Sequence, residues 1–147
     1  RGYVCRFYDR MTRRLHLTVG GKEFLLALTL SGLEELESRS GKPIMDTMSG
    51  GSIPLSMAVD GFWIALRDGG NKKRYTRAEG EELAAQFMGE SEKGFGSLVE
   101  VFMILMAISG ILGSTARHET LLKAGLEDKD GEPIVSDNEK NEKTAGK

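Results

Sequence analysis

Alternating apolar and polar residues predict a β-hairpin over residues 13–30. The pattern has a period of two on both sides of Gly20-Gly21, a pair that suits a two-residue turn. A turn there aligns three pairs across the hairpin: Val19 with Lys22, Leu17 with Phe24, and Leu15 with Leu26. This register places the apolar positions on one face, and a slip by one residue would destroy it. Leu28 and Leu30 are expected to extend the second strand on that face.

Helices are predicted after the hairpin, because start and stop signals recur there. Two segments fit a capping box, in which side chains three residues apart satisfy the first backbone N–H groups: Ser31 with Glu34, and Thr76 with Glu79. Gly41 is expected to end the first of these helices and Gly89 the second. Between them, residues 53–68 predict another helix with Pro54 in its first turn. Ile44, Met45 and Met48 form a short apolar segment.

The most apolar stretch covers residues 97–112 and predicts a long helix. About 16 residues are too few to cross the hydrocarbon core of a membrane, and Glu100 lies inside the stretch. A helix that is apolar nearly all round must be buried on several sides, either within the domain or against another chain. We therefore expect one face to be exposed in the isolated monomer and to bind a partner or a second copy: Met103, Ile104, Ala107 and Ile111.

These patterns predict an α+β fold, with a small N-terminal antiparallel hairpin or sheet followed by a bundle of three to five helices. Residues 13–125 form the expected single domain. Residues 1–12 are interpreted as an extension, because Met11 resembles a natural start; a genuine N-terminal strand in residues 1–10 is the alternative. Residues 126–147 have few large apolar side chains and many charges, which predicts a disordered polar tail.

Composition narrows the functional classes. A formal net charge of −2 provides no overall basic field, so nucleic acid is not an expected partner. One cysteine, Cys5, excludes an intramolecular disulfide and fits a reducing compartment. With two histidines far apart, neither a metal site nor a cofactor is expected.

No residue pattern indicates an active site, so we expect no enzyme activity. Gly50-Gly51 and Gly69-Gly70 lack the residues that follow the glycines of phosphate-binding loops, and linkers are the favoured interpretation. Asp60 has no acid–base partner in the sequence and is interpreted as a solubilising residue. Residues 72–75 could touch nucleic acid, but a solvated connector is favoured. The methionines are interpreted mainly as core filling, although they also suit adaptable apolar contacts.

The order of these features resembles the small tail-assembly chaperones of phages and gene-transfer agents. Members combine an N-terminal hairpin with an acidic helix, and then with an aromatic-bearing helix and a Thr-capped one. The matching residues in this chain are Gly32-Leu33, Leu36-Glu37, Gly41-Lys42, Ile44-Met45, Phe62, Trp63, Leu66-Arg67, Thr76 and Glu79. The resemblance covers about residues 13–112, and the family has no catalytic residue to carry over.

The resemblance implies a role in tail morphogenesis, in the cytoplasm of a bacterial host. Such chaperones keep the tape-measure protein soluble and recruit tail-tube subunits, so these two proteins are the implied partners. Two alternatives remain open from the sequence. The chain could be a tail structural protein associated with the tube, or an unrelated small regulatory module that binds proteins.

Overall fold

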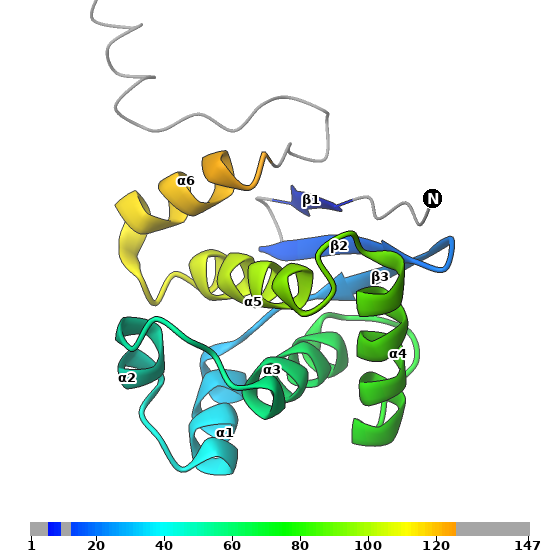
Figure 1. Cartoon of the computed structure of the whole chain (residues 1–147), viewed down its shortest axis with the longest axis horizontal. Helices are drawn as coiled ribbons and strands as arrows, with labels where there is room; N and C mark the ends of the chain where they lie inside the picture. Colours follow the sequence, from blue (N-terminus) through cyan, green and yellow to red (C-terminus); the bar gives the residue numbers. More distant parts are fainter. Residues whose placement is uncertain (1–5, 10–12, 126–147) are drawn as a thin grey trace, which may run out of the picture.

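The computed structural model describes residues 6–9 and 13–125, and these form a three-stranded antiparallel sheet followed by helices (Figure 1). The strands, in the order β1-β2-β3, are Arg6–Asp9, Arg14–Val19 and Lys22–Leu26. The helices are α1 (Leu30–Ser40), α2 (Ile44–Ser49), α3 (Leu55–Asp68), α4 (Arg77–Glu90), α5 (Phe95–Ser109) and α6 (Gly113–Lys123). The predicted α+β class is confirmed. The described residues hold six helices rather than three to five, because the short apolar segment at residues 44–49 and the polar segment after α5 are both helical.

The register of the hairpin β2–β3 is the predicted one. Val19 pairs with Lys22, Leu17 with Phe24 and Leu15 with Leu26. Gly20 and Gly21 both have positive φ angles, 60° and 77°, as a tight two-residue turn requires. The second strand is shorter than predicted. It ends at Leu26, and Leu30 begins α1 and is 71% exposed instead of lying on the apolar face.

The segment before the hairpin contributes a third strand. Residues Arg6–Asp9 pair antiparallel with β2, with Arg6 opposite Leu17 and Asp9 opposite Arg14. Of the two interpretations of residues 1–10, the N-terminal strand is therefore the one that the structure contains at residues 6–9. Residues 1–5 and 10–12, and the predicted tail at 126–147, lie outside the described residues.

The start of α1 differs from the prediction by two residues. Thr29, not Ser31, is the N-cap: its backbone is extended, and its hydroxyl accepts a hydrogen bond of 3.0 Å from the N–H of Gly32. The capping box at Ser31 and Glu34 is therefore wrong. The strand ends just before Thr29, which leaves this residue in the extended conformation that an N-cap needs. Gly41 ends the helix in the left-handed region, as predicted.

The other predicted helix ends are met more closely. At α4, Thr76 and Glu79 form the predicted capping box in both directions. This helix continues past Gly89 to Glu90. Helix α3 begins at Leu55 rather than at residue 53, because Pro54 is its N-cap instead of lying in the first turn.

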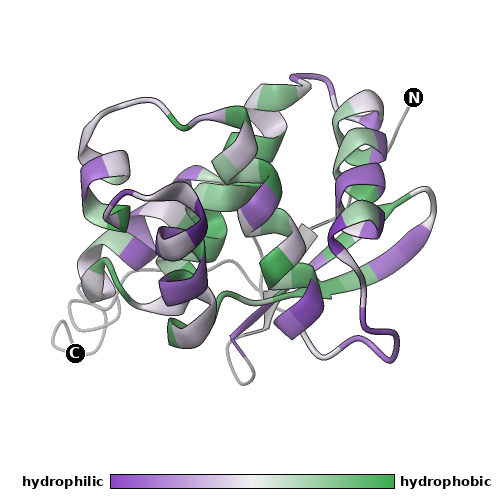
Figure 2. Ribbon diagram, turned by 90° about the horizontal axis from the view of Figure 1, so that it is seen from below, coloured by the Kyte–Doolittle hydropathy of each residue, from purple (hydrophilic) through white to green (hydrophobic). Residues whose placement is uncertain are grey.

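Helix α3 lies at the centre of the fold and contacts α1, α4, α5 and β3 (Figure 1). Two glycines allow neighbouring side chains to approach it closely. A Cβ atom on Gly61 would lie 2.6 Å from the ring of Phe102 on α5, and one on Gly80 of α4 would lie 2.7 Å from Cβ of Trp63. Figure 2 shows hydrophobic residues concentrated where the helices face one another and the sheet, with hydrophilic residues mainly at the periphery.

The open edge of β3 is covered by the connection between α3 and α4. The side-chain amide of Asn71 accepts from the N–H of Leu25 at 2.9 Å and donates to the carbonyl of Leu25 at 2.8 Å. The N–H of Ala27 donates to the carbonyl of Ala65 on α3. These bonds take the place of part of a further strand, because they pair backbone groups of Leu25 and Ala27 that would otherwise be open at this edge.

Candidate functional site

The face of α5 predicted to bind a partner is largely inside the protein. Ile104 and Ala107 are 1% and 0% exposed, Met103 is partly buried, and only Ile111, beyond the helix, is 39% exposed. The expectation that these residues form one exposed face is therefore wrong. The physical reason is that α3 and α4 cover one side of α5 and α6 covers another, so the domain wraps this helix itself.

Large apolar side chains are exposed elsewhere among the described residues. Those most exposed are Leu30 at 71%, Leu55 at 56% and Met45 at 51%. Met45 is on α2, and Leu55 is the first residue of α3, so both belong to the segment of residues 42–55. We call this segment the α2 corner. It lies at the end of the helical layer, where α1, α2 and α3 meet (Figure 1).

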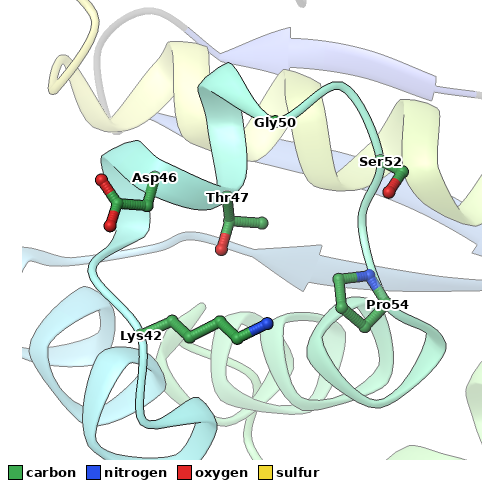
Figure 3. A pocket seen from close by; sticks show the side chains of 6 residues that line it. All are labelled: Lys42, Asp46, Thr47, Gly50, Ser52 and Pro54. Atoms are coloured by element: carbon green, nitrogen blue, oxygen red, sulfur yellow. The ribbon is translucent and has the colours of Figure 1, made fainter.

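A hollow of about 300 Å³, lined mainly by polar residues, opens in the α2 corner (Figure 3). Its lining residues are Lys42, Asp46, Thr47, Gly50, Ser52 and Pro54. In Figure 3 the Lys42 side chain extends below Thr47 toward Pro54. The hollow offers an ammonium, a carboxylate and hydroxyls. Met45 and Leu55 are the chain neighbours of two lining residues, Asp46 and Pro54, and are themselves not part of the lining.

The α2 corner has a defined shape because α1 holds the start of α2. Pro43 caps α2 but has no side-chain acceptor, and the carboxylate of Glu37 on α1 takes that role, accepting from the N–H of Ile44 at 2.7 Å. Ile44 and Thr47 then face inward and are buried, which leaves Met45 on the outer side of this short helix.

A second cluster of polar side chains holds α1, α3 and α4 together. Asp60 is buried, and one of its oxygens accepts from Arg39 at 3.3 Å and from Arg77 at 2.7 Å. The indole N–H of Trp63 donates to the carbonyl of Tyr75. The guanidinium of Arg39 lies 5.2 Å from the centre of the Trp63 ring. The interpretation of Asp60 as a solubilising residue is therefore wrong, because this carboxylate joins three helices.

The cluster continues along α3 through Arg67. Its guanidinium lies 5.0 Å from the ring of Trp63 and donates two hydrogen bonds to Glu35 on α1, of 2.8 and 3.0 Å. Hydrogen bonds to Asp68 and then to Glu35 raise the pKa of Arg67 above its usual range, and the hydrogen bond from Arg67 lowers the pKa of Glu35. These charges neutralise one another, so the cluster fastens helices rather than offering a free acid or base.

The remaining sequence candidates occupy structural positions. Gly50 lines the hollow of the α2 corner, and Gly69 packs against β3, where a Cβ atom would lie 2.0 Å from the carbonyl oxygen of Leu25. Within residues 6–9 and 13–125, no three His, Cys, Asp or Glu side chains come together in a way that could hold a metal ion. Helices in this same part of the chain are too short or too polar to cross a membrane. Cys5 lies outside the described residues.

Sequence reasoning missed the α2 corner because the exposure of Met45 and Leu55 depends on how the helices pack. A weak signal was present, since Met45 and Leu55 flank a connector that contains Gly50, Gly51 and Pro54. Comparison with known proteins adds no further identification: no protein-family model, curated protein or solved structure matches this chain.

Proposed function

We propose that this chain is a tail-assembly chaperone of a phage or prophage, and that it binds the tape-measure protein through the α2 corner. The observation that carries the proposal is the exposure of Met45 and Leu55, 51% and 56%, in the same segment of the chain that holds the hollow. Exposed methionine suits an adaptable apolar contact, and the polar groups around it can fix the orientation of a bound segment.

The resemblance to the chaperone family supports the same region. Gly41-Lys42 and Ile44-Met45 are among the residues that carry the resemblance, and they form the connection from α1 into α2. The proposed client is an apolar helical segment of the tape-measure protein, which would lay its apolar side on Met45 and Leu55. Tail-tube subunits are the second proposed partner, and the cytoplasm of the bacterial host is the proposed location.

Co-expression with a phage tape-measure protein tests the proposal. The wild-type chain should keep that protein in the soluble fraction and co-purify with it. The double variant Met45→Gln/Leu55→Gln should remain folded and lose about tenfold or more in affinity, because two apolar side chains no longer leave water on binding.

A matched control uses apolar residues outside the corner. The double variant Leu30→Gln/Leu122→Gln removes side chains that are 71% and 40% exposed on α1 and α6, and it should bind the client normally. Equal losses in both double variants would show that no particular surface is used. A wild-type chain that leaves the tape-measure protein insoluble and unbound would overturn the proposed function.

A further inference from the structure

Four exposed basic residues lie along the β3 edge of the sheet: Lys22, Lys72, Lys73 and Arg74. We call this set the basic rim. Lys22 belongs to β3, and the other three belong to the connection between α3 and α4, a strongly hydrophilic part of the ribbon (Figure 2). Two aromatic rings join the two segments. Phe24 and Tyr75 meet edge to face with ring centres 6.0 Å apart, and Lys22 and Lys73 lie 5.5 and 5.2 Å from the centres of these rings.

The connection is held in place at both ends. Asn71 is bonded to the backbone of Leu25 and to the carbonyl of Leu66, and the carbonyl of Tyr75 accepts from the indole of Trp63. The basic side chains therefore project from a fixed backbone. A partner that binds them does not have to order the connection first, which lowers the cost of binding.

Most of the charge on the rim is uncompensated. Lys73 pairs with Glu79. No ion pair within the described part of the chain involves Lys22, Lys72 or Arg74. The rim thus presents three cations without a carboxylate partner and suits an anionic segment.

An acidic protein segment fits the rim better than nucleic acid does. The chain as a whole has a net charge of −2, which does not attract a polyanion at long range. Tyr75 already contacts Phe24 and Lys73, so its ring is not a free platform for stacking a base. The same chain contains a suitable acidic segment, residues 127–139, with six Asp or Glu side chains and one lysine.

We propose that residues 127–139 bind the basic rim of the same chain. The described residues end at Gly125, two positions before the segment begins. An extended chain gains about 3.3 Å per residue, so Asp137 and Glu139, near the end of the segment, can lie about 40 Å or more from Gly125. That exceeds the diameter of about 36 Å that a radius of gyration of about 14 Å gives for a compact domain of this size. Covalent attachment raises the effective concentration of the segment to the millimolar range. Occupation of the rim makes it inaccessible to other acidic partners. The inference is independent of the α2 corner.

Zero-length carbodiimide coupling of the full-length chain, followed by peptide mass spectrometry, tests the proposal. This chemistry joins a carboxylate to a lysine only when the two are in direct contact. In about 20 mM salt, coupling of residues 127–139 to Lys72 and Lys73 should exceed coupling to Lys42 and Lys93, which are also exposed, by about fivefold. The pair Lys73–Glu79 serves as an internal positive control.

The variant Arg74→Gln sharpens the test, because it removes one charge from the rim and leaves every lysine in place. Coupling at Lys72 and Lys73 should fall at least twofold, whereas the matched variant Lys93→Gln should leave it unchanged. About 0.5 M salt should abolish the excess over Lys42, since the Debye length then falls to roughly 4 Å.

Four results would overturn the proposal. They are equal coupling at all four lysines, an excess that survives high salt, coupling that is unchanged by Arg74→Gln, and products that join only differently isotope-labelled copies. Single-stranded DNA that binds at about 0.15 M salt and displaces the segment from the rim would identify a nucleic-acid site instead.

Discussion

Helix α5 and the α2 corner are opposite in what their sequences suggest and in what they do in the fold. Helix α5 is the most apolar element, and its sequence suggested an exposed binding face. In the fold, however, Ile104 and Ala107 are almost completely buried. The α2 corner contains a helix of six residues between two connectors, yet Met45 and Leu55 are more than half exposed. The number of neighbouring elements explains the difference, because α5 is packed against three helices and α2 lies at the end of the helical layer.

The comparison teaches that strong hydrophobicity along a helix indicates burial before it indicates binding. A large apolar surface is covered first by the domain's own helices, since each buried side chain contributes about 1.5–3 kcal/mol. Exposed apolar side chains remain where few other helices or strands pack around a segment. Four predictions follow, from the largest expected effect to the smallest, and the first of them tests this difference directly.

The largest effect is expected at α5. Ile104→Glu places a carboxylate at a position that is 1% exposed and belongs to the hydrophobic core. The variant should lose about 4 kcal/mol or more of unfolding free energy and be largely unfolded, as measured by circular dichroism and urea denaturation. Ile111→Glu, at a position 39% exposed, is the control and should stay folded. A folded Ile104→Glu protein would show that α5 can expose this face.

A smaller loss is expected where α3 is fastened to α1 and α4. Asp60→Ala leaves Arg39 and Arg77 without their shared carboxylate, which has only 12% of its side chain exposed. The unfolding free energy should fall by about 2 kcal/mol, because both guanidiniums are partly solvated and recover some interaction with water. Glu82→Ala, at an exposed position on α4, provides the baseline in the same urea titration. Equal urea midpoints for Asp60→Ala and Glu82→Ala would mean that the three helices are held together by apolar contacts alone.

A still smaller loss of stability is expected from substitutions at the start of α1, the helix that leads into the α2 corner. Thr29→Ala removes the hydroxyl that caps α1 and should cost about 1 kcal/mol, as should Thr76→Ala at α4. Ser31→Ala should change stability by less than about 0.5 kcal/mol, because Ser31 is exposed within the first turn. Thermal unfolding of the three variants measures this order. A larger loss for Ser31→Ala than for Thr29→Ala would restore the cap first predicted from the sequence.

The smallest effect concerns an exposed pair that belongs to neither region. Bonding to Lys73, and then to the N–H of Thr76, lowers the pKa of Glu79 to about 2 from an ordinary value of 4.5. A lowered pKa in the folded state stabilises the protein above the unfolded value, and that contribution is lost as the pH falls from about 4.5 to about 2. The melting temperature of wild type should therefore approach that of Glu79→Gln over this interval. A difference in melting temperature between the two proteins that stays constant with pH would contradict the lowered pKa of Glu79.

Local patterns were enough to predict the elements whose partners are close in sequence. The register around Gly20-Gly21 and the capping box at Thr76 depend on residues a few positions apart, and both are confirmed. The cap at Thr29 was missed because Ser31 and Glu34 offered a competing local pattern, and only the end of β3 decides between them.

Features that depend on distant partners could not be predicted in this way. Asp60 meets Arg39 and Arg77 across separations of 21 and 17 residues, and nothing in the sequence near Asp60 indicates either contact. The burial of Ile104 depends in the same way on where α3, α4 and α6 pack. The candidate site was misplaced for that reason: the chain shows which residues are apolar, and the packing decides which of them remain exposed.

Hydrogen exchange of the full-length chain, measured with and without the tape-measure protein, tests most directly whether the α2 corner is the client surface. Residues 42–55 should gain protection in the complex, because a bound segment would cover Met45 and Leu55 and slow opening of the short helix α2. The amides of α5 should exchange equally slowly in both states. New protection confined to α5 and α6, with none at residues 42–55, would contradict the proposal.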